Sequence, residues 1–260
     1  MEETIANESL KKQTIDPMKF IASAMKLPIV KIDRDSYLHT ILSKRYSQET
    51  VEKAIATTPL NAGISEAEIK KLAKSAIDRE TTNVTVVSAA TGIPGGLWMA
   101  ATIPTDLTQY FANILRIMQK LAYLYGWNSF SDAEGNFDDE TANQFVLFLG
   151  VMMGVRSSVS VITKVASSTG SHLARSISAK ALTKTAYYPI IKKIAHMCGT
   201  KMTKQIFGKA VGKIVPVLGA VVSGGITFAS FKPMANRFRK FLESLEYEKV
   251  QDESKISTEK

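Results

Sequence analysis

The sequence contains one cysteine, Cys198, and three histidines among its 260 residues. A single cysteine cannot form an internal disulfide, and no CxxC pair is present for zinc binding or thiol redox chemistry. The histidines, His39, His172 and His196, are too scattered for zinc ligands of ordinary spacing. The motifs GxGxxG, GxSxG and HExxH are absent as well. The sequence therefore predicts no catalytic residue, no metal and no cofactor.

Acidic residues are missing from a long internal segment. No Asp or Glu occurs between residues 141 and 242, whereas 15 Lys and Arg residues do, so this segment has a net charge of +15. Residues 1–140 and residues 243–260 each carry −3, and the whole chain carries +9. The cations of the acid-free segment are balanced by the acidic parts of the protein, by solvent ions or by a polyanion. Solvated lysines on ordinary helices remain the plain alternative.

The N-terminus does not have the pattern of a secretory signal. Residues 1–4 are acidic, where a signal would place positive charge before an apolar run. Together with the single cysteine, this favours a cytoplasmic location, including a peripheral position at the inner face of the membrane. Residues 1–16 and 246–260 are polar with little periodicity, and we expect them to be mobile tails.

Apolar residues recur mainly at helical spacing, and strand-like alternation is almost absent. Ser65 and Glu68 form a capping box, which predicts a helix from near Ser65. Thr105 and Asp106 are typical of a helix start and Gly126 of a helix end, which predicts a second helix between them. The sequence thus predicts an all-α multi-helix bundle, formed as a single domain over residues 17–245.

The segment 127–140 is rich in Ser, Asp, Asn and Gly, and we expect it to be a surface connection and a subdomain seam. Its acidic residues alternate as in a calcium-binding EF-hand loop. The match fails where Phe137 replaces the glycine of the sharp turn and Asn143 replaces the bidentate glutamate. A solvated loop is therefore the favoured interpretation.

Three stretches carry no charged residue: 81–105, 141–155 and 214–231. The first and third are interrupted by proline and glycine, which favours two helical hairpins whose turns allow close backbone approach. Such hairpins either press on a bilayer or form a tightly packed core, and the sequence leaves both open. The glycines expected at the helix turns are Gly92, Gly95, Gly96, Gly219, Gly224 and Gly225.

Polar residues of the second predicted helix also share a face. They are Asp106, Gln109, Asn113, Arg116 and Lys120. A solvated surface is the simplest interpretation of this face. If Asp106 and Arg116 were buried instead, each would need a partner on another helix. Asp106, Asn113 and Arg116 would then belong to a polar cluster inside the bundle.

Four short phrases resemble those of the EcsC protein family: residues 89–96 (AATGIPGG), 103–107 (IPTDL), 123–126 (YLYG) and 214–225 (IVPVLGAVVSGG). The resemblance covers about residues 40 to 242. It implies a helical domain with no assigned reaction or cofactor. Because the family is named after a gene neighbouring an ABC exporter, it also implies a membrane transporter as a partner.

These observations favour a non-enzymatic accessory protein at the cytoplasmic membrane surface. It would bind anionic lipid, or a membrane transporter, through its basic half and its glycine-rich apolar helices. The expected anion-binding residues are Lys192, Lys193, Lys201, Lys204, Lys209 and Lys213. One alternative is nucleic-acid binding, although few aromatic residues accompany the cations. Another is a small-molecule enzyme with a pocket near Trp98 and Asp106.

Overall fold

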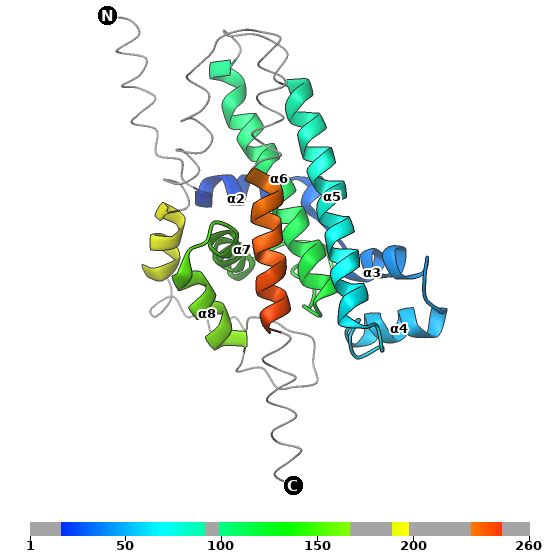
Figure 1. Ribbon diagram of the computed structural model, residues 1–260. Helices are drawn as coiled ribbons and strands as arrows, with labels where there is room; N and C mark the ends of the chain where they lie inside the picture. The colour runs from blue at the N-terminus through cyan, green and yellow to red at the C-terminus, as the bar shows by residue number, and fades with distance from the viewer. Residues whose placement is uncertain (1–16, 92–98, 167–188, 198–229, 246–260) are drawn as a thin grey trace, which may run out of the picture.

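The computed structural model describes residues 17–91, 99–166, 189–197 and 230–245 (Figure 1). These residues form helices joined by turns and loops and contain no β-strand, which confirms the all-α prediction. The predicted tails lie outside the described residues, and so do all six glycines expected at the helix turns. The two interrupted hairpins accordingly stay a prediction.

The first four helical elements are short, and two of them begin at a residue whose side chain caps the helix. They are α2 (Pro17–Met25), the 3-10 helix η1 (Pro28–Val30), α3 (Arg34–Leu42) and α4 (Gln48–Ala56). The Asp33 carboxylate accepts a hydrogen bond from the Ser36 amide at 2.8 Å, and the hydrogen bonds with Ser36 lower the pKa of Asp33. The Ser47 hydroxyl accepts from the Thr50 amide at 3.3 Å. Each side chain satisfies an amide that has no partner within its helix.

Two long helices, α5 (Glu66–Thr91) and α6 (Met99–Leu124), run antiparallel beside each other (Figure 1). The predicted start near Ser65 is confirmed, because the Glu68 amide donates to the Ser65 hydroxyl at 3.4 Å. The predicted end of α6 is also confirmed. Gly126 has a φ of +78°, a left-handed conformation that glycine adopts without strain.

The predicted start of α6 at Thr105 is wrong. The helix begins at Met99, so Pro104 lies within it. A proline removes one amide donor from a helix. Met and Ala, which fill the first three positions, are strong helix formers, and they continue the helix on the far side of that proline.

The centre of the molecule is α7 (Asp139–Met152), where every residue from Phe145 to Met152 is buried. A helix that is buried on every side requires neighbouring elements all around it. Its described neighbours include α2, α6 and α8 (Arg156–Ala166), and Phe148 packs on Phe238 of the helix at residues 230–245 with ring centroids 4.8 Å apart. Figure 1 shows α7 nearly end-on within this ring of helices.

The loop between α6 and α7 is anchored at its start. Trp127 and Phe130 are buried, with Trp127 at 5.1 Å from Phe148 and Phe130 at 5.4 Å from Phe145 between ring centroids. The expectation of a wholly solvated connection is wrong at these two positions, because large aromatic rings gain more from burial than a polar loop sequence indicates. The two sides of the loop share one hydrophobic core.

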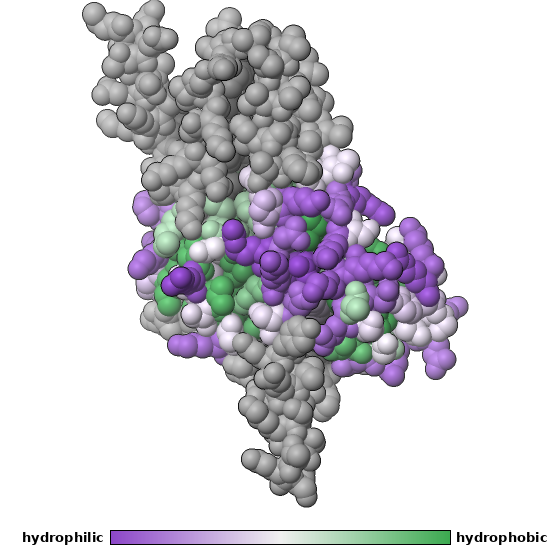
Figure 2. Space-filling model, in the orientation of Figure 1, coloured by the Kyte–Doolittle hydropathy of each residue, from purple (hydrophilic) through white to green (hydrophobic). Residues whose placement is uncertain are grey.

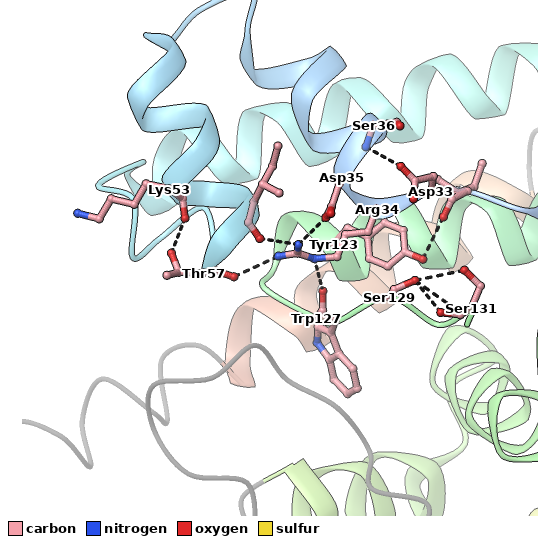
Figure 3. A network of polar contacts seen from close by, with 12 residues as sticks. Asp33, Arg34, Asp35, Ser36, Lys53, Thr57, Tyr123, Trp127, Ser129 and Ser131 are labelled. Atoms are coloured by element: carbon pink, nitrogen blue, oxygen red, sulfur yellow. Dashed lines mark hydrogen bonds and ion pairs between the residues drawn. The ribbon is translucent and has the colours of Figure 1, made fainter. Parts of the chain in front are cut away.

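Arg34 ties three parts of the chain together (Figure 3). Its buried guanidinium donates to the carbonyl oxygens of Trp127 at 3.0 Å, Ile55 at 2.7 Å and Thr57 at 3.1 Å. A fourth bond joins it to the Asp35 carboxylate at 2.9 Å. These contacts hold the ends of α4 and α6 against the start of α3. With four of its donors engaged by protein groups, Arg34 has a structural role.

Candidate anion-binding surface

The amphipathic helix α8 turns a charged side to solvent. Ser158, Val161 and Ile162 are buried against the core, whereas Arg156 and Lys164 are exposed. Its entry is set by the turn after α7, where Gly154 has a φ of +73° and the following amide donates back to Gly150 O at 2.8 Å. The 3.6-residue period then separates the buried side from the exposed side.

A second helix, residues 189–197, packs at the same place. Its buried residues are Ile191, Ile194 and Ala195, and its exposed residues include Lys192 and Lys193.

The two helices meet at Gly150 of α7. A Cβ atom on Gly150 would lie 1.9 Å from Ser158 Oγ of α8 and 2.8 Å from Ile194 Cγ2. Only glycine allows this close approach. Since α8 and the helix at residues 189–197 both pack on this residue, the two helices lie next to each other (Figure 1).

The exposed cations of these two neighbouring helices are what we call the cationic face, defined by Arg156, Lys164, Lys192 and Lys193. Neither helix contains a carboxylate. A group of cations without acids on the same elements produces a positive potential that attracts anions.

Two cations near the end of the acid-free segment form ion pairs within the protein. Lys232 forms an ion pair with Asp78 of α5 at 2.7 Å, and Arg239 pairs with Glu243 at 2.7 Å. Glu243 also binds Lys70 of α5 at 2.7 Å. In Figure 2, hydrophilic residues cover the surface over α5 and the helix at residues 230–245. More hydrophobic residues are visible on the side of α8. Lys232 and Arg239 thus belong to an ion-paired region around α5 and Glu243.

Of the six lysines predicted to bind anions, Lys192 and Lys193 belong to the cationic face. The other four, Lys201, Lys204, Lys209 and Lys213, lie outside the described residues.

The polar residues of α6 form contacts inside the bundle. Arg116 Nη2 lies 3.4 Å from Glu80 Oε1 of α5, and Lys120 pairs with the same carboxylate. Another Arg116 nitrogen donates to the Ile29 carbonyl oxygen. The interpretation as a solvated face is wrong for Arg116 and Lys120, because this side of α6 faces α5 and the segment around η1.

Asn113, another member of that predicted cluster, forms its hydrogen bond within its own helix. Asn113 is buried, and its side-chain amide donates to Gln109 O of its own helix at 2.9 Å. Asp106 is part of α6, but its side chain lies outside the described ones.

Glu80 holds this cluster together electrostatically. Burial by itself would raise the pKa of the Glu80 carboxyl, but the hydrogen bond and charge of Lys120 and the charge of Arg116 outweigh it and lower that pKa. Burial also lowers the pKa of Lys120, against the opposing effect of Glu80. A carboxylate held ionised between two cations is a poor general base, so the arrangement is typical of a structural ion cluster.

The sequence-based prediction did not include Glu80, although its spacing from apolar residues of the same helix indicates that it is buried. It follows Ile77 by three residues and Ala76 by four, so it falls on the apolar side of α5. An acidic residue at such a position requires a buried cationic partner.

The small-molecule pocket predicted near Trp98 and Asp106 involves side chains outside the described ones and stays a prediction. A pocket between α5, the end of α6 and the helix at residues 230–245 encloses about 20 Å³, room for about one water molecule. Its lining includes Thr58, Leu60, Ile69 and Tyr125. Within the described ranges, no three His, Cys, Asp or Glu side chains are grouped to hold a metal ion. In the loop, Asp132 instead accepts from the Asn136 amide at 2.6 Å.

No family model matches the chain, and no curated protein or solved structure is similar enough to count as a match. The resemblance to the EcsC family therefore stays a prediction. Among the helices that the structure describes, none combines the length and the apolar character needed to cross a bilayer.

Proposed function

We propose that this protein is a non-enzymatic accessory protein that binds an anionic membrane surface through the cationic face. The supporting observation is that two neighbouring helices expose four cations and contain no carboxylate. The face follows the outer sides of two packed helices and thus suits an extended array of lipid phosphates better than a single small ligand. Anionic headgroups supply the complementary charge.

The strength of such binding follows from the number of cations. Each Lys or Arg near an anionic bilayer contributes about 1 kcal/mol, so four contribute roughly 4 kcal/mol, which corresponds to about millimolar affinity. Lasting attachment of the protein to the membrane needs a further contribution to the binding free energy. We propose that Lys201, Lys204, Lys209 and Lys213 add to it, since they belong to the same acid-free segment.

We further propose that the protein acts at the cytoplasmic side of the membrane. The resemblance to the EcsC family adds a membrane transporter as a partner at that site. Lipid binding would then concentrate the protein in the plane where such a partner lies.

The test is cosedimentation with vesicles of phosphatidylcholine, with and without phosphatidylglycerol. The double variant Lys192→Glu/Lys193→Glu should lose binding to the anionic vesicles. The matched control is Lys44→Glu/Lys53→Glu, which changes the charge equally at exposed positions near α3 and in α4, on the opposite side of the molecule (Figure 1). It should bind nearly as the unaltered protein does. Thermal melts followed by circular dichroism establish that both variants fold.

Equal loss of binding in the two variants would contradict a specific face and leave only the effect of net charge. Salt-sensitive binding to DNA or RNA, without any preference for anionic vesicles, would replace this function by nucleic-acid binding.

A further inference from the structure

Arg237 lies across the turn between α7 and α8. One of its terminal nitrogens donates to the Met152 carbonyl oxygen at the end of α7. Its Cζ and Nε atoms each lie 3.6 Å from the position that a Cβ atom on Gly154 would take. Because Arg237 belongs to the helix at residues 230–245, these contacts bring a guanidinium of that helix to the turn where α8 begins.

Arg156, the first residue of α8, follows the same turn. It comes two residues after Gly154, so the Cα atoms of these two residues are at most about 7.6 Å apart. The long Arg156 side chain can span this distance. Both arginines are exposed, and neither α8 nor residues 230–242 contain a carboxylate. Two guanidinium groups are thus within reach of one another, and the helices that carry them there supply no counter-charge.

The chemistry of these two side chains favours phosphate as the missing counter-charge. A guanidinium presents its donors as a planar fork that matches two oxygens of one phosphate, whereas a lysine offers a point charge. Arg237 has one acceptor among the described residues, the Met152 carbonyl oxygen, and its other donors face water. That bond also holds the guanidinium in place, so a ligand orders it at little further cost.

We infer that Arg156 and Arg237 together hold one phosphate group at the turn between α7 and α8, supplied by the headgroup of an anionic lipid. This inference rests on the proposed function. It names the chemical group that is recognised, and it adds a residue of the helix at 230–245 beside the cationic face.

A shared phosphate differs from plain charge attraction in how the two arginines are coupled. Cations that attract a surface independently contribute additively to the binding free energy, so the losses caused by two substitutions multiply. When two arginines hold one phosphate, the first substitution already weakens that contact, and the second costs less. A purely structural role of Arg237 at the end of α7 would not change the effect of substituting Arg156.

The experiment is a double-mutant cycle on the full chain, measured by cosedimentation with phosphatidylcholine/phosphatidylglycerol vesicles. Arg156→Gln and Arg237→Gln should each lower the partition coefficient by about fivefold, the factor expected of one cation near an anionic bilayer. The double variant should lose clearly less than the product of about 25-fold. Lys53→Gln, at an exposed position of α4, is the matched control and should change binding by less than about twofold.

Glutamine keeps an amide donor for the Met152 carbonyl oxygen, and thermal melts establish that each variant folds. Should Arg237→Gln fail to fold, Arg237→Lys replaces it in the cycle, because it keeps the charge and removes the fork. A double variant whose loss equals the product of the single losses overturns the shared phosphate and leaves the proposed function standing.

If the unaltered protein does not sediment with anionic vesicles, the proposed function fails, and inorganic phosphate without vesicles decides the inference. A Tm that is higher in phosphate than in chloride at equal ionic strength, with the difference lost in Arg237→Gln, would support the arginine pair with a soluble phosphate as its ligand. An equal Tm in the two salts would overturn the inference as well.

Discussion

At Gly150 of α7, side chains of the neighbouring helices already occupy the space that a Cβ atom would take. The first contact of an added Cβ would be Ser158 Oγ, at 1.9 Å. Gly150→Ala should therefore lower the free energy of unfolding by about 1–3 kcal/mol, the usual penalty of overpacking, which outweighs the better helix propensity of alanine. Urea unfolding measures this change.

Adding Ser158→Gly to Gly150→Ala should restore part of the lost stability, since the two side chains compete for one space. Unchanged stability of Gly150→Ala would mean that α8 shifts away at little cost.

Ser158 brings a hydroxyl into the same contact without a hydrogen-bond partner, although the residue is fully buried. An unsatisfied buried hydroxyl costs about 1–3 kcal/mol, so Ser158→Ala should raise the free energy of unfolding by about 1 kcal/mol. Ser157→Ala, at the exposed position beside it, should change stability only by the small difference in helix propensity. A lower stability of Ser158→Ala in urea would indicate that the hydroxyl is bound to a buried water.

At the scale of helices, the Glu80 cluster joins α5 to α6 and to the segment around η1. Glu80→Gln would leave Lys120 and Arg116 without their counter-charge inside the bundle, and we expect it to lower the free energy of unfolding by about 3 kcal/mol. Glu68→Gln on the same helix removes only exposed ion pairs and should cost less than about 1 kcal/mol. Similar losses in the two variants would contradict a special role for Glu80.

The stabilities of the unaltered protein and of the Glu80→Gln variant should also depend differently on pH. The pKa of the Glu80 carboxyl is lowered in the folded protein from its ordinary value of 4.5. Its ion pairs therefore stabilise the fold fully above about pH 4.5, and this contribution is lost as the pH falls through the lowered pKa. The stability difference between the unaltered protein and Glu80→Gln should shrink below that pH in urea unfolding measured at several pH values. A constant difference would mean that folding does not change the pKa of the Glu80 carboxyl.

Helix ends were predictable wherever local chemistry sets them. The capping box at Ser65 and the left-handed Gly126 act through their own neighbours, so the sequence contains the whole signal. The start of α6 was mispredicted because Thr105 and Asp106 are capping residue types that also occur inside helices. Which side of α6 is solvated was not predictable from that helix alone, since the answer depends on Glu80 in α5.

At the scale of the whole molecule, the charge distribution predicts how binding responds to salt. The screening length shrinks from about 10 Å at 0.1 M salt to about 3 Å at 1 M. Cosedimentation with anionic vesicles should therefore fall steeply over this range, and cell fractionation at low and high salt should move the protein from the membrane pellet to the supernatant. Retention in the pellet at high salt would show that apolar contacts dominate the attachment.

The sequence by itself determined the helical class, several helix ends and the acid-free segment of the chain, because periodicity, capping and charge are properties of neighbouring residues. Only the tertiary structure decided which cations remain on a common face. Lys232 and Arg239 meet carboxylates, whereas Lys193 lies on a surface formed by two helices without any. The physical reason is that ion pairing and burial depend on which helices pack together, and here that packing depends on a close contact at Gly150.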